Sequence, residues 1–336
     1  MKYLQFIGTQ RSGSNLLRVM LNQLPDISAP HPPHILKTFV PLLPRYGDLS
    51  SPENLSLLAS DVCRWVNANP VSWSPYLAEP HVVLKMMKSE GLVGIFETLS
   101  EGKAMSDDAS AWCCKSMESV AYTSLIEEAG LRPIYLYLYR DGRDVALSFM
   151  KAIVGPKHIF HLAVKWAEEQ RLAIQLEKQI DPKRFISIRY EDLISDPETQ
   201  LRRLCAGIGE EFSTAMLDYS RSDESRRTAE AGRMWENLDK PVLKGNSRKF
   251  IGELSMQQIR IFEQVAGDVL ERLGYECVTD AVHGADFSDE EKEVFMEEEK
   301  LLQQHARTVA DPGDMERRRP QEMLLKEILA RNPMVK

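Results

Sequence analysis

Residues 8–15, GTQRSGSN, combine glycines, small hydroxyl-bearing residues and one cation, which are groups that bind phosphate or sulfate. The loop follows the apolar run 3–7, and apolar residues at helical spacing follow it over 16–24. A strand, a glycine turn and a helix in this order direct backbone N–H groups and the positive end of a helix dipole at an anion. The expected contacts come from Arg11, Ser12, Gly13, Ser14 and Asn15.

The spacing of Gly8 and Gly13 has the outline of the nucleotide P-loop, GxxxxGK[ST]. A P-loop continues with a lysine and a magnesium-binding serine or threonine, whereas this chain has Ser14 and Asn15, and its cation, Arg11, precedes the second glycine. The loop therefore predicts an anion site that needs no metal. By itself it also fits an ordinary strand-to-helix turn with a surface arginine.

Two histidines stand in a proline-rich segment soon after the first helix. His31 and His34 belong to residues 30–34, PHPPH, whose prolines forbid a regular helix and stiffen the backbone. An imidazole can act as general base near neutral pH, so either histidine could deprotonate a group held near the anion loop. The alternative is a rigid surface turn with incidental histidines.

The order of elements predicts an α/β fold. Apolar runs indicate strands at 3–7, 81–87, 111–115, 133–139 and 185–190. Helical patterns lie at 53–66, 90–99, 119–129, 145–151, 158–178, 198–208 and 255–273. Because strands that alternate with helices form parallel sheets, we expect a P-loop-like three-layer sandwich with a central parallel sheet flanked by helices.

Further cations stand at two predicted strand ends. Lys115 ends the strand 111–115, and Arg140 follows the most apolar strand, at the edge where open α/β sheets bind ligands. Arg140 and Ser148 could converge on one phosphate if the intervening turn folds back. Arg143, in the same turn, is expected to form a surface ion pair.

Composition fits one large α/β domain with additions, or two domains. The chain has 336 residues, of which 43% are hydrophobic and 27% charged, and its net charge of −8 argues against a general nucleic-acid binder. No secretory signal is visible and no apolar run approaches the roughly 18 residues of a membrane span, so a cytoplasmic location is expected. Five cysteines without CxxC spacing indicate neither a disulfide framework nor a zinc site.

Three stretches, each at the end of a predicted strand, carry a family resemblance. They are residues 8–17, GTQRSGSNLL, residues 137–149, YLYRDGRDVALSF, and residues 189–193, RYEDL. In this order they resemble the 5′-phosphosulfate loop, the 3′-phosphate motif and a later strand-end motif of sulfotransferases that use 3′-phosphoadenosine 5′-phosphosulfate (PAPS). The first has the arginine-bearing form of tyrosylprotein and many bacterial members. A weaker match at 244–250, KGNSRKF, resembles the family's late basic loop.

The resemblance, which runs from about residue 3 to residue 275, implies a role for the matched residues. The first loop would hold the 5′-phosphosulfate, the second motif the 3′-phosphate, and the tyrosine of the third would lie near the adenosine. Leu243 stands where the late basic loop commonly has an arginine. The implied nucleotide contacts, beyond the first loop, are Arg140, Ser148, Tyr190, Lys244, Gly245 and Arg248.

The resemblance also implies the catalytic residues. Lys115 matches the lysine that approaches the transferred group, and Arg11 neutralises charge on the leaving phosphate. Relatives use as base a histidine after the lysine strand or a glutamate soon after the first helix. Residues 115–118 contain no histidine, and His31 falls close to the place of that glutamate. We therefore expect His31 as base, with His34 as its rival.

Three functions follow as alternatives. The first is in-line transfer of a sulfuryl group from PAPS to a hydroxyl or amine of an organic acceptor, with 3′-phosphoadenosine 5′-phosphate (PAP) as product and no metal. The second is a magnesium-dependent P-loop kinase or NTPase, and the third is a non-catalytic nucleotide-binding protein. A partly apolar pocket for a small-molecule or lipid-like acceptor is expected from His31, His34, Phe39, Trp73, Tyr76, Met86, Met87 and Trp235.

The sequence predicts a sulfotransferase domain at 1–278 and a charged helical C-terminal extension at 279–336. Before that boundary, the polar segment 220–240 could form part of an acceptor gate. Helical patterns in the extension cover 286–310 and 319–331. An apolar seam on them could pack on the core or on a second subunit, giving a homodimer. Its members are Phe295, Leu301, Leu302, Met323, Leu324, Leu325 and Ile328.

Overall fold

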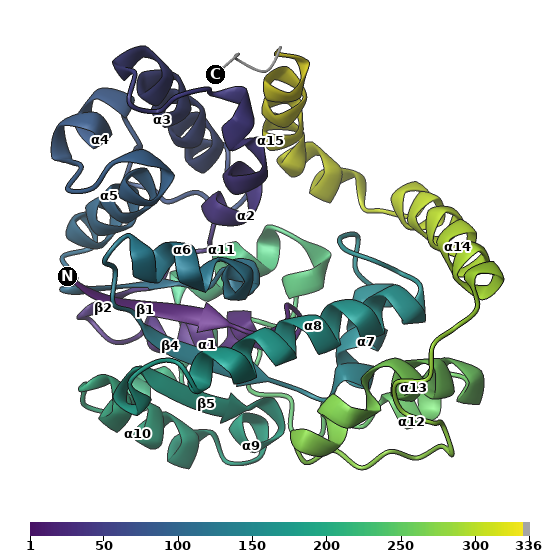
Figure 1. Ribbon diagram of the computed structural model, residues 1–336. Coiled ribbons are helices and arrows are strands. Elements are labelled where there is room, and N and C mark those ends of the chain that lie inside the picture. Colours follow the sequence, from purple (N-terminus) through teal and green to yellow (C-terminus); the bar gives the residue numbers. More distant parts are fainter. Residues whose placement is uncertain (332–336) are drawn as a thin grey trace.

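Five parallel strands form the centre of the computed structural model, which describes residues 1–331 (Figure 1). Their bounds are β1 Lys2–Ile7, β2 Ile27–Ser28, β3 Ala111–Cys114, β4 Ile134–Tyr139 and β5 Phe185–Arg189. The strand order is β2-β3-β1-β4-β5. In the central strand, Leu4 lies opposite Cys113 of β3 and Phe6 opposite Leu136 of β4. β1 is buried on both faces, as its uninterrupted apolar run predicts.

The strand order reverses at β1. The chain places β2 and β3 on one side of β1 and then β4 and β5 on the other. Helix α1 (Ser14–Leu21) follows β1, and α7 (Gly142–Met150) follows β4. Because β1 and β4 are neighbours, the loops after them lie side by side at the edge where α/β sheets bind ligands.

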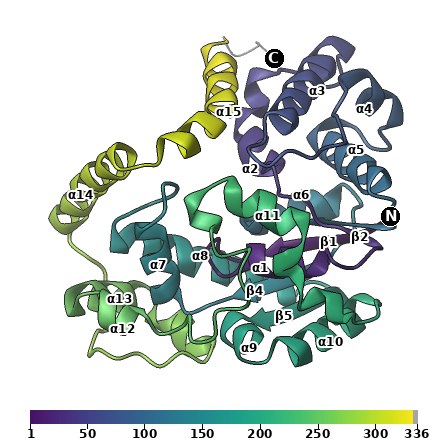
Figure 2. The same ribbon diagram turned by 180° about the vertical axis from the view of Figure 1, so that it is seen from behind.

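Helices cover both faces of the sheet, which confirms the three-layer sandwich (Figures 1 and 2). On one face, α1 and α10 (Pro197–Ile208) share a hydrophobic cluster with Leu4 and Phe6. On the other, α8 (Ile159–Glu177) packs against β1 and β4. Helix α13 (Met256–Arg272) packs on α8, where Trp166 contacts Phe262. Trp166 is thus a core residue.

A second hydrophobic cluster joins several helices to the β2–β3 side of the sheet. Tyr3 of β1 stacks on Trp112 of β3, with 3.6 Å between ring centroids, and both belong to this cluster. Its elements are α2 Ile35–Phe39, η1 Val40–Arg45, α3 Pro52–Asn67, α4 Pro80–Met86 and α5 Gly91–Ser106.

The prediction of a strand at 81–87 is wrong, because this segment is helix α4. Pro80 occupies the first turn, where a proline without an N–H is well accommodated. Only one side of this helix is buried. Val83 is buried, whereas Val82 and Met86 are exposed. One buried stripe suits a helix on the outside of a helical cluster, whereas a central strand is buried on both faces.

Smaller departures from the predicted elements occur elsewhere. The helix predicted at 119–129 is split into a 3-10 turn and a short α-helix, and the two-residue strand β2 has no counterpart in the prediction. The remaining elements are η2 Met117–Tyr122, α6 Thr123–Glu128, η3 Pro182–Arg184, α9 Tyr190–Ser195, η4 Thr214–Met216 and α12 Phe250–Glu253.

The polar segment 220–240 contacts α1 through α11 (Asp223–Glu230) and lines the cavity through η6 (Arg233–Trp235) and the residues after it. It also contains η5 Tyr219–Arg221. The buried Arg18 of α1 donates from Nη1 to Glu224 Oε1 at 2.5 Å and from Nη2 to Thr228 Oγ1 at 2.8 Å. These bonds hold α11 on α1.

The C-terminal extension forms α14 (Asp289–Thr308) and α15 (Pro312–Ala330), which lie along one side of the molecule (Figures 1 and 2). Phe295 packs with Phe160 and Phe287, and Leu324 and Ile328 join the cluster that contains α3. This part of the predicted seam packs on the same chain. Three of its members are exposed: Leu301, Leu302 and Met323.

Among residues 1–331, no helix has both the length and the apolar character needed to cross a bilayer.

Candidate active site

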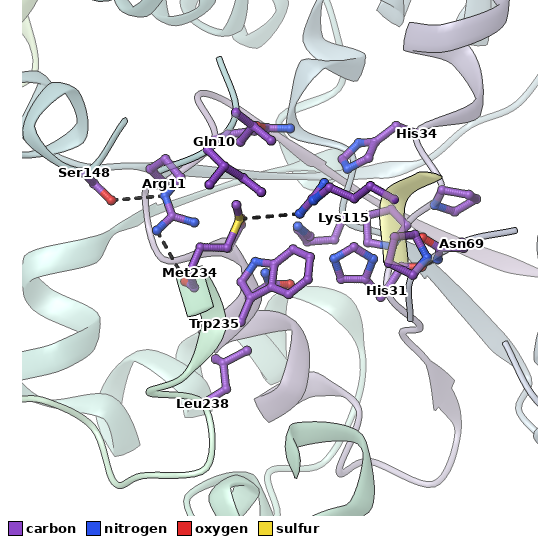
Figure 3. A pocket seen from close by; sticks show the side chains of 18 of the residues that line it. Gln10, Arg11, His31, His34, Asn69, Lys115, Ser148, Met234, Trp235 and Leu238 are labelled. Atoms are coloured by element: carbon purple, nitrogen blue, oxygen red, sulfur yellow. Dashed lines mark hydrogen bonds between the residues drawn. The ribbon is translucent and has the colours of Figure 1, made fainter. Parts of the chain in front are cut away.

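A cavity of about 870 Å³ opens at the carboxyl ends of β1 and β4. Such a volume lies in the upper part of the range of roughly 300–1,000 Å³ that is typical of small-ligand sites. Its walls come from the anion loop, the proline-rich segment, η6 and α15. In Figure 3, Lys115, His31 and Trp235 converge in its centre, with Arg11 and Ser148 to one side.

The anion loop has the backbone that its glycines predict. Gly8 has φ 121°, Gly13 has φ 90°, and Arg11 lies at φ 72°, a left-handed conformation that is uncommon for a residue with a side chain. A Cβ on Gly13 would lie 2.3 Å from Cδ2 of Tyr190, so this position needs glycine. Such strain is often found at binding sites.

Helix α1 begins at this loop without a side-chain cap. The first-turn residues Ser14, Asn15 and Leu16 line the cavity together with Gly13. Their backbone N–H groups and the helix dipole are therefore directed at the cavity, as anion binding requires.

Arg11, Ser148 and Arg140 lie close together at the carboxyl ends of β1 and β4. Arg11 Nε donates to Ser148 Oγ at 3.1 Å, and Arg140 Nη1 donates to the Arg11 carbonyl oxygen at 3.3 Å. Burial lowers the pKa of Arg11 to about 10, and the charge of Arg140 adds to the shift. The first and second motifs thus build one cationic site.

Tyr190, from the third motif, lies against the same site. The Arg140 guanidinium lies 4.4 Å from the centroid of the Tyr190 ring and donates from Nη2 to the Asn246 carbonyl oxygen at 2.9 Å. Asn246 Nδ2 in turn donates to Tyr190 Oη at 2.7 Å. Sequence reasoning missed Asn246, although it lies inside the KGNSRKF stretch.

The other predicted residues of the late basic loop do not line the cavity. Lys244, Gly245 and Arg248 are exposed. The backbone turns them outward because Asp144 accepts the N–H groups of Arg248, at 2.7 Å, and Phe250, at 3.0 Å. Their contact with a nucleotide stays a prediction.

His31 is a buried imidazole that faces the cavity without a hydrogen-bond partner. Only 4% of its surface is exposed, and within the described residues neither Nδ1 nor Nε2 has a polar partner. Its carbonyl oxygen accepts from Asn69 Nδ2 at 3.0 Å and from Trp73 Nε1 at 2.7 Å, which fixes the backbone. Burial, aided by Lys115, lowers the pKa of His31 well below its usual range, so the ring is a neutral proton acceptor at neutral pH.

His34 also lines the cavity but has partners. Its Nδ1 lies 3.1 Å from Ser116 Oγ and 3.9 Å from Glu118 Oε2. Burial lowers the pKa of His34 to about 3, against the opposing charge of Glu118. These contacts tie His34 to the cavity wall, whereas His31 retains free ring nitrogens.

Lys115 lies buried between the anion loop and the histidines. Only 5% of its surface is exposed. Burial lowers its pKa to about 7, with the charges of Arg18 and Arg11 contributing. Lys115 is therefore charged below about pH 7 and neutral above it.

Two other expectations are corrected. Arg143 forms a buried ion-pair network, not a surface pair: Nη2 lies 2.7 Å from Asp141 Oδ2 and Nη1 2.6 Å from Glu263 Oε1. The packing of α13 on α7 brings Glu263 to it, a contact that no local pattern reveals. Most predicted acceptor-pocket residues also fail to line this cavity: Phe39, Trp73, Tyr76, Met86 and Met87.

Several cavity residues were not predicted. Asn69 and Trp65 come from α3 and the turn after it, Met234 from η6, and Arg318 from α15. Their positions depend on how distant helices pack, so the sequence carries no local signal for them.

Comparison with known proteins gives the family. A family model described as "Sulfotransferase family" matches residues 5–214, which is more than half of the chain. The chain belongs to the sulfotransferase family. The three motifs that form the cationic site all lie within the matched residues, whereas α11, η6, α14 and α15 lie beyond them.

The individual proteins to which this chain is similar share about a fifth of its residues. The chain is 22% identical over 277 residues to "Protein-tyrosine sulfotransferase A" of Caenorhabditis elegans, and the match covers 80% of this chain and 66% of that protein, just under two thirds. Among solved structures, the sulfotransferase domain of the Synechococcus PCC 7002 olefin synthase is 20% identical with a TM-score of 0.53, covering 82% of this chain and 94% of that one. The sulfotransferase domain from the curacin biosynthetic pathway is 19% identical with a TM-score of 0.55, covering 82% and 99%. These likenesses support the fold.

Proposed function

We propose that the protein transfers a sulfuryl group from PAPS to a hydroxyl or amine of a small-molecule or lipid-like acceptor. The observation that carries the proposal is the convergence of Arg11, Ser148 and Arg140 at the uncapped start of α1, in one cavity with the unpartnered His31. Family membership favours this function over a kinase or NTPase.

The site fits a bisphosphorylated nucleotide. Arg140 Nε and Ser12 Oγ are buried polar atoms without a partner among the described residues, which is unfavourable unless a ligand supplies one. The loop N–H groups and Arg11 would hold the 5′-phosphosulfate, and Arg140 with Ser148 the 3′-phosphate. When bound, PAPS supplies the sulfuryl group and the leaving 5′-phosphate.

The residues of this chain then have distinct roles. His31 takes the proton of the acceptor hydroxyl on a free ring nitrogen. Lys115 and Arg11 neutralise the negative charge that develops during transfer, where a buried site strengthens the interaction. The wall at Trp235 excludes water. Because cations and backbone N–H groups supply the positive charge, we propose that transfer needs no metal.

Calorimetric titration of PAP without magnesium, next to ATP with and without magnesium, tests the nucleotide site. We expect tight binding of PAP, with ATP much weaker, and a loss of about tenfold or more in Arg11→Ala and Arg140→Ala, because each removes a charge-assisted hydrogen-bond donor. Arg132→Ala is the matched control, because it removes an exposed arginine that precedes β4, at the end of the strand opposite to Arg140. Binding of ATP with magnesium but not of PAP would overturn the proposal in favour of a kinase or NTPase.

Transfer itself is tested by rate measurements with an acceptor found in a screen of hydroxyl compounds. His31→Ala should lower kcat by about a hundredfold or more while PAP affinity stays within twofold, roughly the effect of losing a general base. If His34→Ala gives that loss instead, the base is His34. A protein that binds PAP and transfers nothing to any acceptor would be a non-catalytic binder. The cytoplasmic location and a homodimer through residues 279–336 stay predictions.

A further inference from the structure

Helix α15 supplies a wall of the cavity that lies outside the matched family region. Met315, Arg318, Gln321 and Leu325 line the cavity from this helix. Gln321 Nε2 donates to the Trp65 carbonyl oxygen at 3.0 Å, and Arg317 Nε donates to the Ala231 carbonyl oxygen at 3.0 Å. The helix is therefore held on both sides, at the end of α3 and at the segment before η6.

Arg318 is a partly buried cation on this wall without an ion-pair partner. Its Nη2 contacts only the Met234 sulfur, at 4.0 Å, and its guanidinium lies 5.6 Å from the Trp235 ring centroid. Within residues 1–331, no carboxylate oxygen lies within 4.0 Å of it. Burial lowers the pKa of Arg318, against the opposing charges of Asp314 and Glu322.

The carboxylates nearest to Arg318 on α15 belong to Asp314 and Glu322, and neither pairs with it directly. Asp314 accepts from Arg317 Nη2 at 2.7 Å and from the Arg233 backbone N–H at 3.2 Å. Glu322, one turn after Arg318, also lines the cavity but is exposed, and its charge acts on Arg318 without a direct ion pair. A half-buried guanidinium gains from a directly bound anion, and its fork of donors suits a carboxylate.

Trp235 connects this cation to the base. The indole contacts the His31 ring nearly edge to face, with 4.7 Å between centroids. The guanidinium of Arg318 lies over the same indole. Trp65 and Leu325 add apolar surface to the same part of the cavity. The acceptor end thus has a base, an apolar wall and a cation, in that order.

We propose that the acceptor is an amphipathic hydroxy acid: its carboxylate binds Arg318, its apolar body lies against Trp235, and its hydroxyl reaches His31. This inference rests on the proposed function and names the substrate class of the same site. An uncharged alcohol would leave Arg318 unpaired in the filled cavity, so the acid is expected to bind more tightly than any neutral analogue.

The test compares a medium-chain ω-hydroxy fatty acid with its methyl ester, each titrated into the full chain that has been saturated with PAP. We expect the acid to bind about tenfold or more tightly than the ester, because only the acid forms the charge-assisted pair. Arg318→Met should remove this preference by weakening the acid alone. The same loss should appear in KM for the acid, with kcat changed much less, because Arg318 lies away from the reacting atoms.

Arg319→Met is the matched control, since Arg319 is the exposed neighbour on α15 and does not line the cavity. It should keep the full preference for the acid. A preference that persists in Arg318→Met, or an acid that binds no better than its ester, would overturn the inference. A phosphate monoester of the same chain that binds more tightly than the acid would overturn the carboxylate assignment. PAP binding, measured first, separates these results from a failure of the proposed function.

Discussion

At the scale of single residues, the cavity is notable for cations that have no carboxylate partner or only a distant one. Arg11 and Lys115 have no carboxylate within ion-pair distance among residues 1–331, and Arg140 has Asp144 at 3.7 Å. Burying an unpaired charge is unfavourable, and a bound polyanion removes that cost. Three cations can therefore supply the positive charge that magnesium supplies in P-loop enzymes.

The lowered pKa of Lys115, about 7, predicts a pH dependence. A lysine is charged below its pKa and neutral above it, so the charge that stabilises transfer is lost as pH rises through about 7. We expect kcat/KM for PAPS to fall across this range, because kcat/KM follows ionisation of the free enzyme. His31, whose pKa lies well below its usual range, is already neutral there and adds no loss.

Initial rates measured on both sides of pH 7 check this prediction. In Lys115→Arg the guanidinium keeps its charge, so the fall should move to higher pH even if the absolute rate is lower. A fall at an unchanged pH in this variant would show that another group titrates.

At the scale of elements, Gly13 allows the anion loop, the start of α1 and the end of β5 to pack closely together. The loop after β1 turns at this glycine into α1, and the ring of Tyr190, at the end of β5, lies directly against it. A close backbone approach of this kind lets first-turn N–H groups, Arg140 and Tyr190 face one anion.

Gly13→Ala should therefore weaken PAP binding by about tenfold or more. A Cβ would lie 2.3 Å from Tyr190 Cδ2 and displace that ring, at a cost of about 1–3 kcal/mol. Calorimetry with PAP measures the loss.

Gly130→Ala is the matched control. Gly130 has φ 83°, close to that of Gly13, but its Cβ would meet nothing within 4 Å. It shares the backbone strain, about 1–3 kcal/mol, without the clash. Equal loss of PAP affinity in the two variants would show a general loss of stability and not a local effect of the contact with Tyr190.

At the scale of the whole molecule, the extension joins parts that are far apart in sequence. The start of α15 binds the segment before η6, whereas its end packs on α3 through Ile328 and through the pair of Arg64 with Glu327, at 2.6 Å. The predicted boundary at 278 thus falls between segments that share the cavity. We expect residues 279–331 to unfold together with the rest.

Ile328→Ala tests this expectation. Ile328 is fully buried, so the cavity left behind should lower the free energy of unfolding by about 2–5 kcal/mol and shift a single cooperative transition. Met323→Ala, on the exposed side of the same helix, should change it by no more than about 0.5 kcal/mol. Denaturant unfolding followed by circular dichroism gives both values. Two separate transitions, of which Ile328→Ala shifts only one, would show that the extension folds independently.

The sequence alone predicted the α/β sandwich, the anion loop and, if the turn after β4 folds back, the convergence of Arg140 and Ser148, because strands, glycine turns and helix starts are local patterns and parallel strands align their carboxyl ends. The contact of Arg11 with Ser148 came only from the structure. The sequence favoured His31 as base over His34 by position alone, and the contacts that distinguish the two rings, with Trp235 and Ser116, come from distant segments.

Only the tertiary structure decided which distant residues meet, including those at the acceptor end of the cavity. The burial of Arg143 beside Glu263, the outward turn of Lys244 and the place of Arg318 over Trp235 all follow from packing between helices far apart in the chain. An amphipathic pattern shows that a helix buries one face but not which partner covers it. That choice is made by the shape and charge of surfaces that exist only once the chain has folded.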